Sequence, residues 1–483
     1  MAQRSASIAE LVCVVALLIV YGATMAPSLT WANHGADGGD LVTAVARGSI
    51  PHPPGFPTYL LSGGLFIRLP WGEPARRLNL MSAVFASGAA GLTALGVGTL
   101  LRLGIRELGT GVVDRGTDRP MAYNLPAAIG AGLTLGLAPL FWSQALIAEV
   151  YALAAFFTAL VVVLALDRGR AGILSLAWGI GLGTHPTLLF LAPLLGWGAW
   201  GKSDGRSGRL VKAGFLALLG WGAMYGPVLL VRGDVPSPWG DVRSFAGWWA
   251  LVSGQLYREY LFGLPLVAWP RRLLAWTGLL SRQFTPVGAV LAGLGWMYLW
   301  REERSFALAS ALAFGCFSLY AVGYNTADSL VYMVPALPLA GLWLGVGLAG
   351  ATDWVRYRAR GGEWAVLVLP LLLALLFWGQ MDLRSDRTAI EWAEQVLGQA
   401  PSQAMLLTAQ DAHTFTLWYV HDVLGKRPDV VVVDQDLWIH RPYREMVGEV
   451  LGLKVRESGL ALEEAARRTG RPIVRVPYNQ VGQ

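Results

Sequence analysis

Residues 8–26 read IAELVCVVALLIVYGATMA, and this run decides the class of the fold. An α-helix needs about 20 mostly apolar residues to cross a lipid bilayer, and the run is about that long. A cleavable signal peptide has a shorter apolar core and ends at a small-residue cleavage site. We therefore expect residues 8–26 to form a retained membrane-spanning helix.

The composition of the whole chain excludes an ordinary soluble protein. Of its 483 residues, 54% are hydrophobic and only 14% are charged, and the mean hydropathy is +0.47. The net charge is +6, but the basic residues lie in short loops between apolar runs, which is a topology signal and not a nucleic-acid-binding stripe. Cys13 and Cys316 both fall inside apolar runs, so no disulfide framework is expected.

The apolar runs predict a polytopic α-helical bundle of about eleven transmembrane helices. They lie at about 8–26, 78–101, 123–142, 149–166, 171–184, 187–200, 211–231, 284–300, 305–322, 331–350 and 365–380.

The distribution of Arg and Lys predicts the orientation of this bundle. With eleven spans, the Arg- and Lys-bearing loops near 102–119, 168–170, 202–212, 301–304 and 356–360 all fall on the side of the N-terminus. The positive-inside rule makes that side the cytoplasm of a cell (inner) membrane protein. The extracytoplasmic side then carries a first loop at 27–76, a second long loop at 232–283 and the tail.

The tail differs in composition from the rest. AMLLTAQ (404–410) and PDVVVVDQD (428–436) are short apolar runs on either side of a helical pattern, TFTLWYVHDVLG (414–425), and 460–469 indicates another helix. We therefore divide the chain into a transmembrane module at 1–380 and a small extracytoplasmic α/β domain at 381–483.

The first extracytoplasmic loop begins NHGADGGDLVTAVARG (33–48) and places Asp37 and Asp40 just after the first span. Aspartates in an Asp-Gly turn often only bond nearby backbone amides. Asp40 could also be an N-cap for a short amphipathic helix over 41–47, lying at the membrane interface. A cap explains one aspartate and leaves Asp37 available for chemistry.

The same loop continues IPHPPGFPTYLLS (50–62), in which four prolines exclude helix until about Thr58. His52 stands between two prolines that fix its backbone, which suits either a hydrogen bond to a substrate or a purely structural role. His34, Asp37, Asp40 and His52 could alternatively bind a divalent metal, although their spacing matches no specific motif. A short helix from Thr58 to Leu69 is expected to lie along the membrane surface.

Further polar side chains gather at the predicted outer ends of the spans. Glu149 and Tyr151 begin one span, where a carboxylate is also favoured by the helix dipole, and His185 lies between two short helices. Three more candidates stand at another span entrance: Asn325, Asp328 and Tyr332.

The second long loop interleaves arginines with aromatic residues in GQLYREYLFG (254–263) and WPRRLLAW (269–276). Such a pattern is typical of an interfacial segment with an aromatic belt and snorkelling arginines. It is equally suited to a phosphate clamp, because a guanidinium can contact a phosphate in bidentate fashion. Arg258, Arg271 and Arg272 are the candidates for this clamp.

These motifs together resemble the bacterial glycosyltransferase family 117. The resemblance runs in order through DGGDLVTAVARGSIPHPPGFPTYLLSG, RRLNLMSA, AEVYAL, GLGTHPTLLFLAP, GQLYREYLFG, YNTADSLVYMVP and QDAHTFTLWYVHDVLGKRPDVVVVDQDLW. The chain departs from the pattern at Gly39-Asp40, where Gly-Glu is usual, and at 410–413, where a more acidic run is usual.

This resemblance implies the glycosyltransferase-C superfold and a relationship to protein O-mannosyltransferases. It implies transfer of a sugar from a polyprenyl-phosphate donor to a protein or glycan acceptor outside the cytoplasm, with Asp37 at the position of the general base and Asp40 beside it. A transporter or flippase of lipid-linked sugars is the rival hypothesis. It would need polar groups at the bilayer midplane, whereas the predicted spans carry almost no charge.

Overall fold

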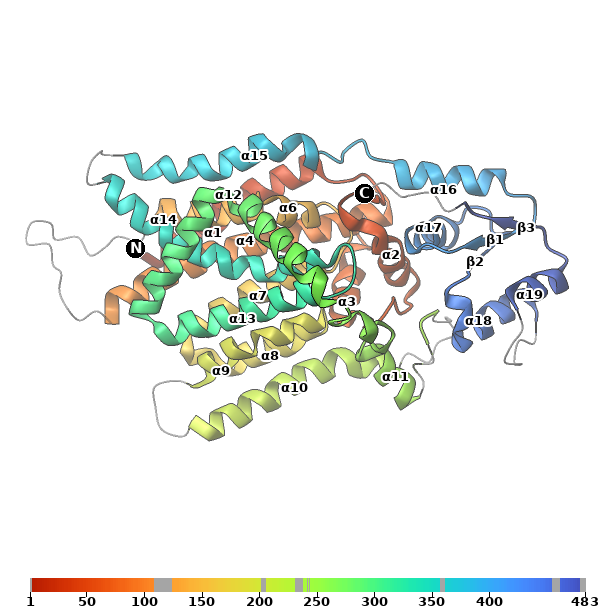
Figure 1. The fold of residues 1–483 in the computed structure, drawn as a ribbon, viewed down its shortest axis with the longest axis horizontal. Helices are drawn as coiled ribbons and strands as arrows, with labels where there is room; N and C mark the ends of the chain where they lie inside the picture. Colours follow the sequence, from red (N-terminus) through yellow and green to blue (C-terminus); the bar gives the residue numbers. More distant parts are fainter. Residues whose placement is uncertain are drawn as a thin grey trace, which may run out of the picture.

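The computed structural model describes residues 2–107, 124–200, 206–230, 238–240, 242, 244–356, 361–453 and 461–477. Most of the described chain is a bundle of long helices that run side by side along the long axis of the molecule (Figure 1). The bundle helices are α1 (Ala2–Thr24), α4 (Pro74–Glu107), α5 (Leu125–Gly136), α6 (Pro139–Ala145), α7 (Tyr151–Leu166), α8 (Ala171–Leu182), α9 (Ala192–Trp200), α10 (Arg206–Leu230), α12 (Trp269–Glu302), α13 (Arg304–Gly323), α14 (Leu337–Arg356) and α15 (Val368–Met381).

Small residues let these helices pack closely, as is common in membrane bundles. A Cβ added at Gly295 of α12 would lie 1.9 Å from the carbonyl oxygen of Trp343 on α14. Conversely, a Cβ at Gly347 of α14 would lie 2.0 Å from the carbonyl oxygen of Leu291. The two helices therefore touch backbone to backbone at these positions.

The described helices support a polytopic membrane protein. Five of them are long and apolar enough to cross a bilayer, and the number rises to seven if the bent pairs 125–145 and 151–182 each count as one span. Only described residues enter this count, so the eleven spans of the sequence stay a prediction. Much of the predicted cytoplasmic loops, including Arg115, Arg119, Lys202, Arg358 and Arg360, lies outside the described residues.

One end of the bundle gathers the short helices of the connecting segments (Figure 1). These are η1 (Ala32–Asp37), α2 (Gly38–Arg47), α3 (Pro57–Phe66), α11 (Phe245–Val252), η4 (Gln255–Tyr260) and, beside them, η3 (Pro186–Leu191) and η6 (Ser329–Ala336). The helix predicted over 41–47 lies within α2, whose residues 38–44 are buried and which packs on α17 (Asp411–Trp418); its position at the membrane interface stays a prediction.

The segment 232–283 is not a continuous loop. After α11 and the short 3₁₀ turns, α12 already begins at Trp269, so Arg271 and Arg272 stand on its first turn and not in a loop. Thr285, with φ 59° and ψ 163°, bends α12 just before Pro286, because proline cannot donate the helical hydrogen bond.

The tail folds into a parallel sheet of order β2-β1-β3 with flanking helices. Its elements are α16 (Thr388–Gln399), β1 (Met405–Thr408), α17, a π-helical turn (Tyr419–Val423), β2 (Val431–Asp434), α18 (Arg441–Leu451), α19 (Leu462–Thr469) and β3 (Ile473–Arg475). Met405 pairs with Val431 on one side and with Ile473 on the other. Every residue of β1 is buried, which is typical of a central strand in a parallel sheet.

Candidate active site

A cavity of about 470 Å³ lies where the connecting segments meet the bundle. Its lining comes from η1, the proline loop, the start of α7, η3, η4, the start of η6 and the first turn of α17. Eight of the predicted site residues line it: Asp37, His52, Glu149, Tyr151, His185, Arg258, Asp328 and Tyr332. The residues that the sequence placed at outer span ends are thus brought together around one space.

Two carboxylates hold His52 at the wall of this cavity. Asp37 Oδ2 lies 3.6 Å from His52 Nε2, and Asp40 Oδ2 lies 2.8 Å from His52 Nδ1. The backbone N–H of His52 also donates to Asp40 Oδ2 at 2.7 Å, and Trp239 Nε1–H donates to Asp40 Oδ1 at 3.2 Å. Asp40 is 3% exposed and does not line the cavity, so it orients His52, whereas Asp37 faces the open space.

The local sequence produces this arrangement. Asp37 ends η1 and Asp40 sits in the first turn of α2, where neither side chain caps the helix. The proline loop then folds back over α2, and Phe56, with φ 42°, starts α3. The prolines restrict the backbone on both sides of His52 and so hold its ring against Asp40.

The charges around His52 shift its pKa and that of Asp37. Burial by itself lowers the pKa of His52, but the charge of Asp37 and the hydrogen bond and charge of Asp40 outweigh it and raise that pKa to about 9. The pKa of Asp37 is raised, mainly by burial and further by Asp40, with His52 opposing. The Asp37 side chain is 39% exposed because it faces the cavity.

Glu149 lies in the bend before α7 and is 2% exposed. Burial, followed by the charge of Asp37, raises its pKa well above the ordinary value. Its Oε1 is buried without a hydrogen-bond partner among the described residues. An uncompensated buried charge is costly, so this environment favours the neutral form of the Glu149 carboxyl over its charged form.

His185 contributes a neutral imidazole. Burial, followed by the positive charge of His52, lowers its pKa to about 3. Its Nδ1 lies 2.7 Å from the Thr187 hydroxyl and accepts from the Thr187 N–H at 3.3 Å. The ring contacts Tyr332 and Tyr151 at centroid distances of 5.5 and 5.8 Å. It therefore forms part of an aromatic wall.

The three predicted arginines have different positions. Arg258 lines the cavity and is the only Arg or Lys among its described lining residues. Arg272 instead donates through one guanidinium nitrogen to the carbonyl oxygens of Tyr324 and Thr326 and to Ser329 Oγ. Arg271 is exposed outside the cavity lining, as is Asn325, whose N–H donates to the carbonyl of Tyr260.

Sequence analysis missed one carboxylate. Asp411, at the first position of α17, lines the cavity, and burial together with the charges of Asp37 and Asp434 raises its pKa to about 7. It comes three residues after β1, and the carboxyl end of a parallel strand is a common place for functional side chains. The position of Asp411 shortly after the apolar run of β1 is therefore the sequence feature that could have identified it.

The four residues considered for a metal do not form one cluster. His34 lines a different cavity from Asp37 and His52. Within the described parts of the chain, no group of three or more His, Cys, Asp or Glu side chains could hold a metal ion. The candidate divalent metal therefore has no evident ligand set here.

Fold and site together define a polytopic helical membrane protein with an acidic, aromatic-walled cavity at one end of its bundle. The fold is that of the glycosyltransferase-C class. The crystal structure of ArnT from Cupriavidus metallidurans bound to undecaprenyl phosphate is similar, with a TM-score of 0.52 and 13% identity over 92% of this chain and 94% of ArnT.

Sequence comparisons find similarity to one group of proteins over part of the chain. Residues 37–205 match the profile of the protein O-mannosyl-transferase TMEM260 N-terminal domain. The protein O-mannosyl-transferase TMEM260 of Mus musculus is 25% identical, across 85% of this chain and 60% of the mouse protein. The chain thus spans about three fifths of the length of that relative.

Proposed function

We propose that the chain is a membrane glycosyltransferase that moves a sugar, with mannose as the first candidate, from a polyprenyl-phosphate-linked donor to an acceptor hydroxyl of a protein or glycan. Its site would open on the extracytoplasmic face of the cell inner membrane, with residues 381–483 as a domain on that face. The observation that carries the proposal is the single cavity that both Asp37 and Arg258 line. Similarity to an O-mannosyl-transferase and the shared fold add support. Membership of the bacterial glycosyltransferase family 117 stays a prediction.

In the proposed reaction, Asp37 takes the proton of the acceptor hydroxyl as its oxygen bonds to the anomeric carbon of the sugar. The bond from that carbon to the donor phosphate breaks, and the lipid phosphate leaves with the electron pair. The raised pKa of Asp37 makes it a stronger base than an exposed aspartate. Protonated His52, 3.6 Å from Asp37, keeps the carboxylate in place before the transfer.

The leaving phosphate needs positive charge beside it, and Arg258 is the candidate to supply it. A guanidinium can donate two parallel hydrogen bonds to a phosphate. Among the residues that the structure describes, Arg258 has one hydrogen-bond contact, of 3.4 Å to Ser253 Oγ, which leaves its other donors available to a phosphate. Asp328 and Glu149 are candidates for contacts with sugar hydroxyls, because both line the same space.

A transporter of lipid-linked sugars is the alternative, and the positions of the polar groups argue against it. Glu149 precedes α7, His185 precedes η3 and Asp328 precedes η6, so each stands at the end of an apolar helix and not at its middle. Such positions suit chemistry at the headgroup level more than passage through the bilayer.

The enzyme and transporter hypotheses can be distinguished by experiment. The purified chain is reconstituted in liposomes with radiolabelled polyprenyl-phosphate mannose and acceptor peptides or glycans. We expect label in the acceptor and an equal amount of released polyprenyl phosphate. Redistribution of intact donor between leaflets without any product would refute the enzyme and support the transporter.

A further inference from the structure

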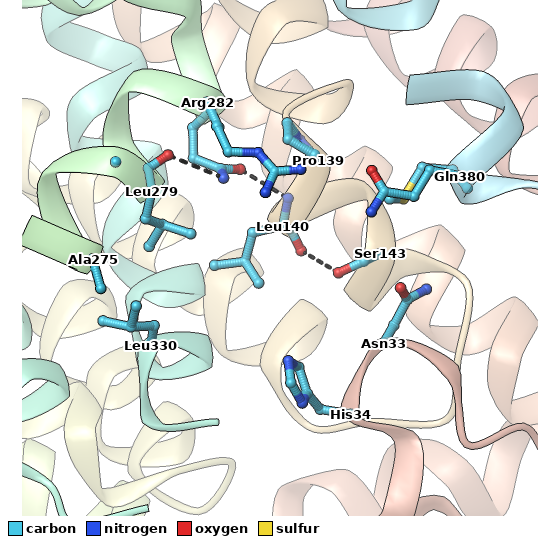
Figure 2. A pocket seen from close by; sticks show the side chains of 13 residues that line it. Asn33, His34, Pro139, Leu140, Ser143, Ala275, Leu279, Arg282, Leu330 and Gln380 are labelled. Carbon is cyan, nitrogen blue, oxygen red and sulfur yellow. Dashed lines mark hydrogen bonds between the residues drawn. The ribbon is translucent and has the colours of Figure 1, made fainter. Parts of the chain in front are cut away.

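A second cavity, of about 460 Å³, lies on the other side of η1 from Asp37. Asn33 and His34 of η1 form its floor, and Asp37 at the end of the same short helix faces the first cavity. The remaining walls come from α6, one face of α12 and the end of α15 (Figure 2). No described residue lines both cavities, so the second one is a separate site.

The polar groups around this second cavity are suited to an anion. Figure 2 shows Arg282 and Gln380 on one side and Asn33 and His34 on the other side of the space between them. Its described lining includes no Asp or Glu. Guanidinium, imidazole and amide groups can all donate hydrogen bonds to a phosphate oxygen.

Several of these donors are not used within the protein. Among the described residues, Arg282 has no hydrogen-bond or ion-pair partner, and its guanidinium contacts only the Phe377 ring at 5.7 Å. Asn33 Nδ2 is buried with no partner. Gln283, by contrast, is occupied, because its Oε1 accepts from the Leu140 N–H at 2.8 Å. A guanidinium and a buried amide that line the same cavity without partners among the described residues could both donate hydrogen bonds to a bound anion.

The position of the cavity indicates that this anion is carried by a lipid. Arg282 stands just before the bend of α12 at Thr285, and Gln380 is next to the last residue of α15, so the site lies beside this bend and at the end of a helix that is apolar enough to cross a bilayer. Beside it, apolar side chains point outward: Leu274 is 72% exposed on α12, and Leu375 is 81% exposed on α15. Acyl chains would cover this surface while a headgroup enters the cavity.

We propose that this second cavity binds the phosphate headgroup of an anionic glycerophospholipid. Arg282 and the Asn33 amide contact the phosphate, and the fatty-acyl chains lie along α12 and α15. The site is separate from the place proposed for the sugar donor, and its occupancy does not depend on transferase activity.

The proposal is tested by native mass spectrometry of the full chain in detergent, titrated with phosphatidylglycerol or phosphatidylcholine. We expect phosphatidylglycerol to bind more tightly, and Arg282→Gln to weaken its binding about 10-fold, because a charged hydrogen bond is lost. The matched control is Arg68→Gln, an exposed arginine that lines neither cavity and should leave binding unchanged.

A second variant tests the cavity without changing charge. A Cβ at Gly278, which lines the cavity, meets no atom within 4 Å, so Gly278→Leu fills open space and should exclude the lipid without disturbing the fold. Equal affinity for the two lipids, or equal effects of Arg282→Gln and Arg68→Gln, would overturn the proposal. So would displacement of phosphatidylglycerol by undecaprenyl phosphate, which would assign the cavity to the donor, or by inorganic phosphate at equal concentration, which would indicate a free-anion site.

Discussion

Replacement of Asp40 by asparagine tests whether this residue acts through His52. Asp40 Oδ2 accepts from both the backbone and the ring of His52, and Asp40 Oδ1 accepts from Trp239. Asp40→Asn keeps the size of the side chain and removes its charge. We expect the pKa of His52 to fall, since both the hydrogen bond and the charge of Asp40 contribute to its elevation.

The size of the effect follows from the raised pKa. The pKa of His52 rises from an ordinary 6.5 to about 9, and each pH unit of such a difference corresponds to about 1.4 kcal/mol. Because the folded state binds this proton more tightly, the protonated imidazole stabilises the fold by about 3 kcal/mol below pH 6.5. That stabilisation is lost as the pH rises through about 9. Asp37 remains in the variant, so Asp40→Asn is expected to remove only part of this stabilisation.

The assay is thermal unfolding in detergent, followed by tryptophan fluorescence between pH 6 and pH 9.5. We expect Asp40→Asn to be clearly less stable than the native chain at pH 6. The gap between their midpoints should narrow by roughly 2–4 °C at pH 9.5, where the native chain has also lost the His52 contribution. Asp167→Asn, in an exposed ion pair with Arg170, is the control and should show no such narrowing. A constant gap between native and Asp40→Asn protein would refute the coupling of Asp40 to His52.

Three further variants test packing, protonation and phosphate contact. Gly39→Ala would place a Cβ 2.3 Å from the carbonyl oxygen of Phe415 and should lower the free energy of unfolding by about 2 kcal/mol. Gly64→Ala is the control, because a Cβ there meets open space and should not lower the stability. Equal unfolding midpoints of the two variants would contradict the α2–α17 contact. Glu149→Gln should unfold within a few degrees of the native chain at pH 7, because burial favours the neutral form of this acid. A large loss of stability would indicate that Glu149 is ionised. Arg258→Gln should lower kcat/KM for the lipid donor about 10-fold or more, with a fall in kcat, because Arg258 is assigned to the charge of the leaving phosphate. An unchanged kcat/KM would exclude it from the phosphate contact.

The sequence was sufficient where a position depends on the end of an apolar helix. Asp37, Glu149, His185 and Asp328 were all placed at span ends on one side, and the structure brings them to one cavity. The length of the apolar runs and the positive-inside rule support that prediction, because both describe whole helices and not single contacts.

Sequence reasoning was insufficient where a role depends on tertiary hydrogen bonds. The sequence offered an N-cap role for Asp40, whereas its actual role follows from contacts with His52 and Trp239 that hold it outside the cavity lining. Arg272 is occupied by carbonyl groups of a segment some fifty residues away. Asp411 reaches the cavity because α17 packs on α2, a contact that no local pattern specifies.

The central claim is that Asp37 removes the acceptor proton in a sugar transfer, and purified Asp37→Asn protein tests it most directly. With polyprenyl-phosphate sugar and acceptor, we expect the turnover rate to fall by about 100-fold or more, since a positioned general base contributes that much. Asp382→Asn, in a surface ion pair with Arg384, should retain full turnover. Turnover by Asp37→Asn at the rate of the Asp382→Asn control would contradict the account.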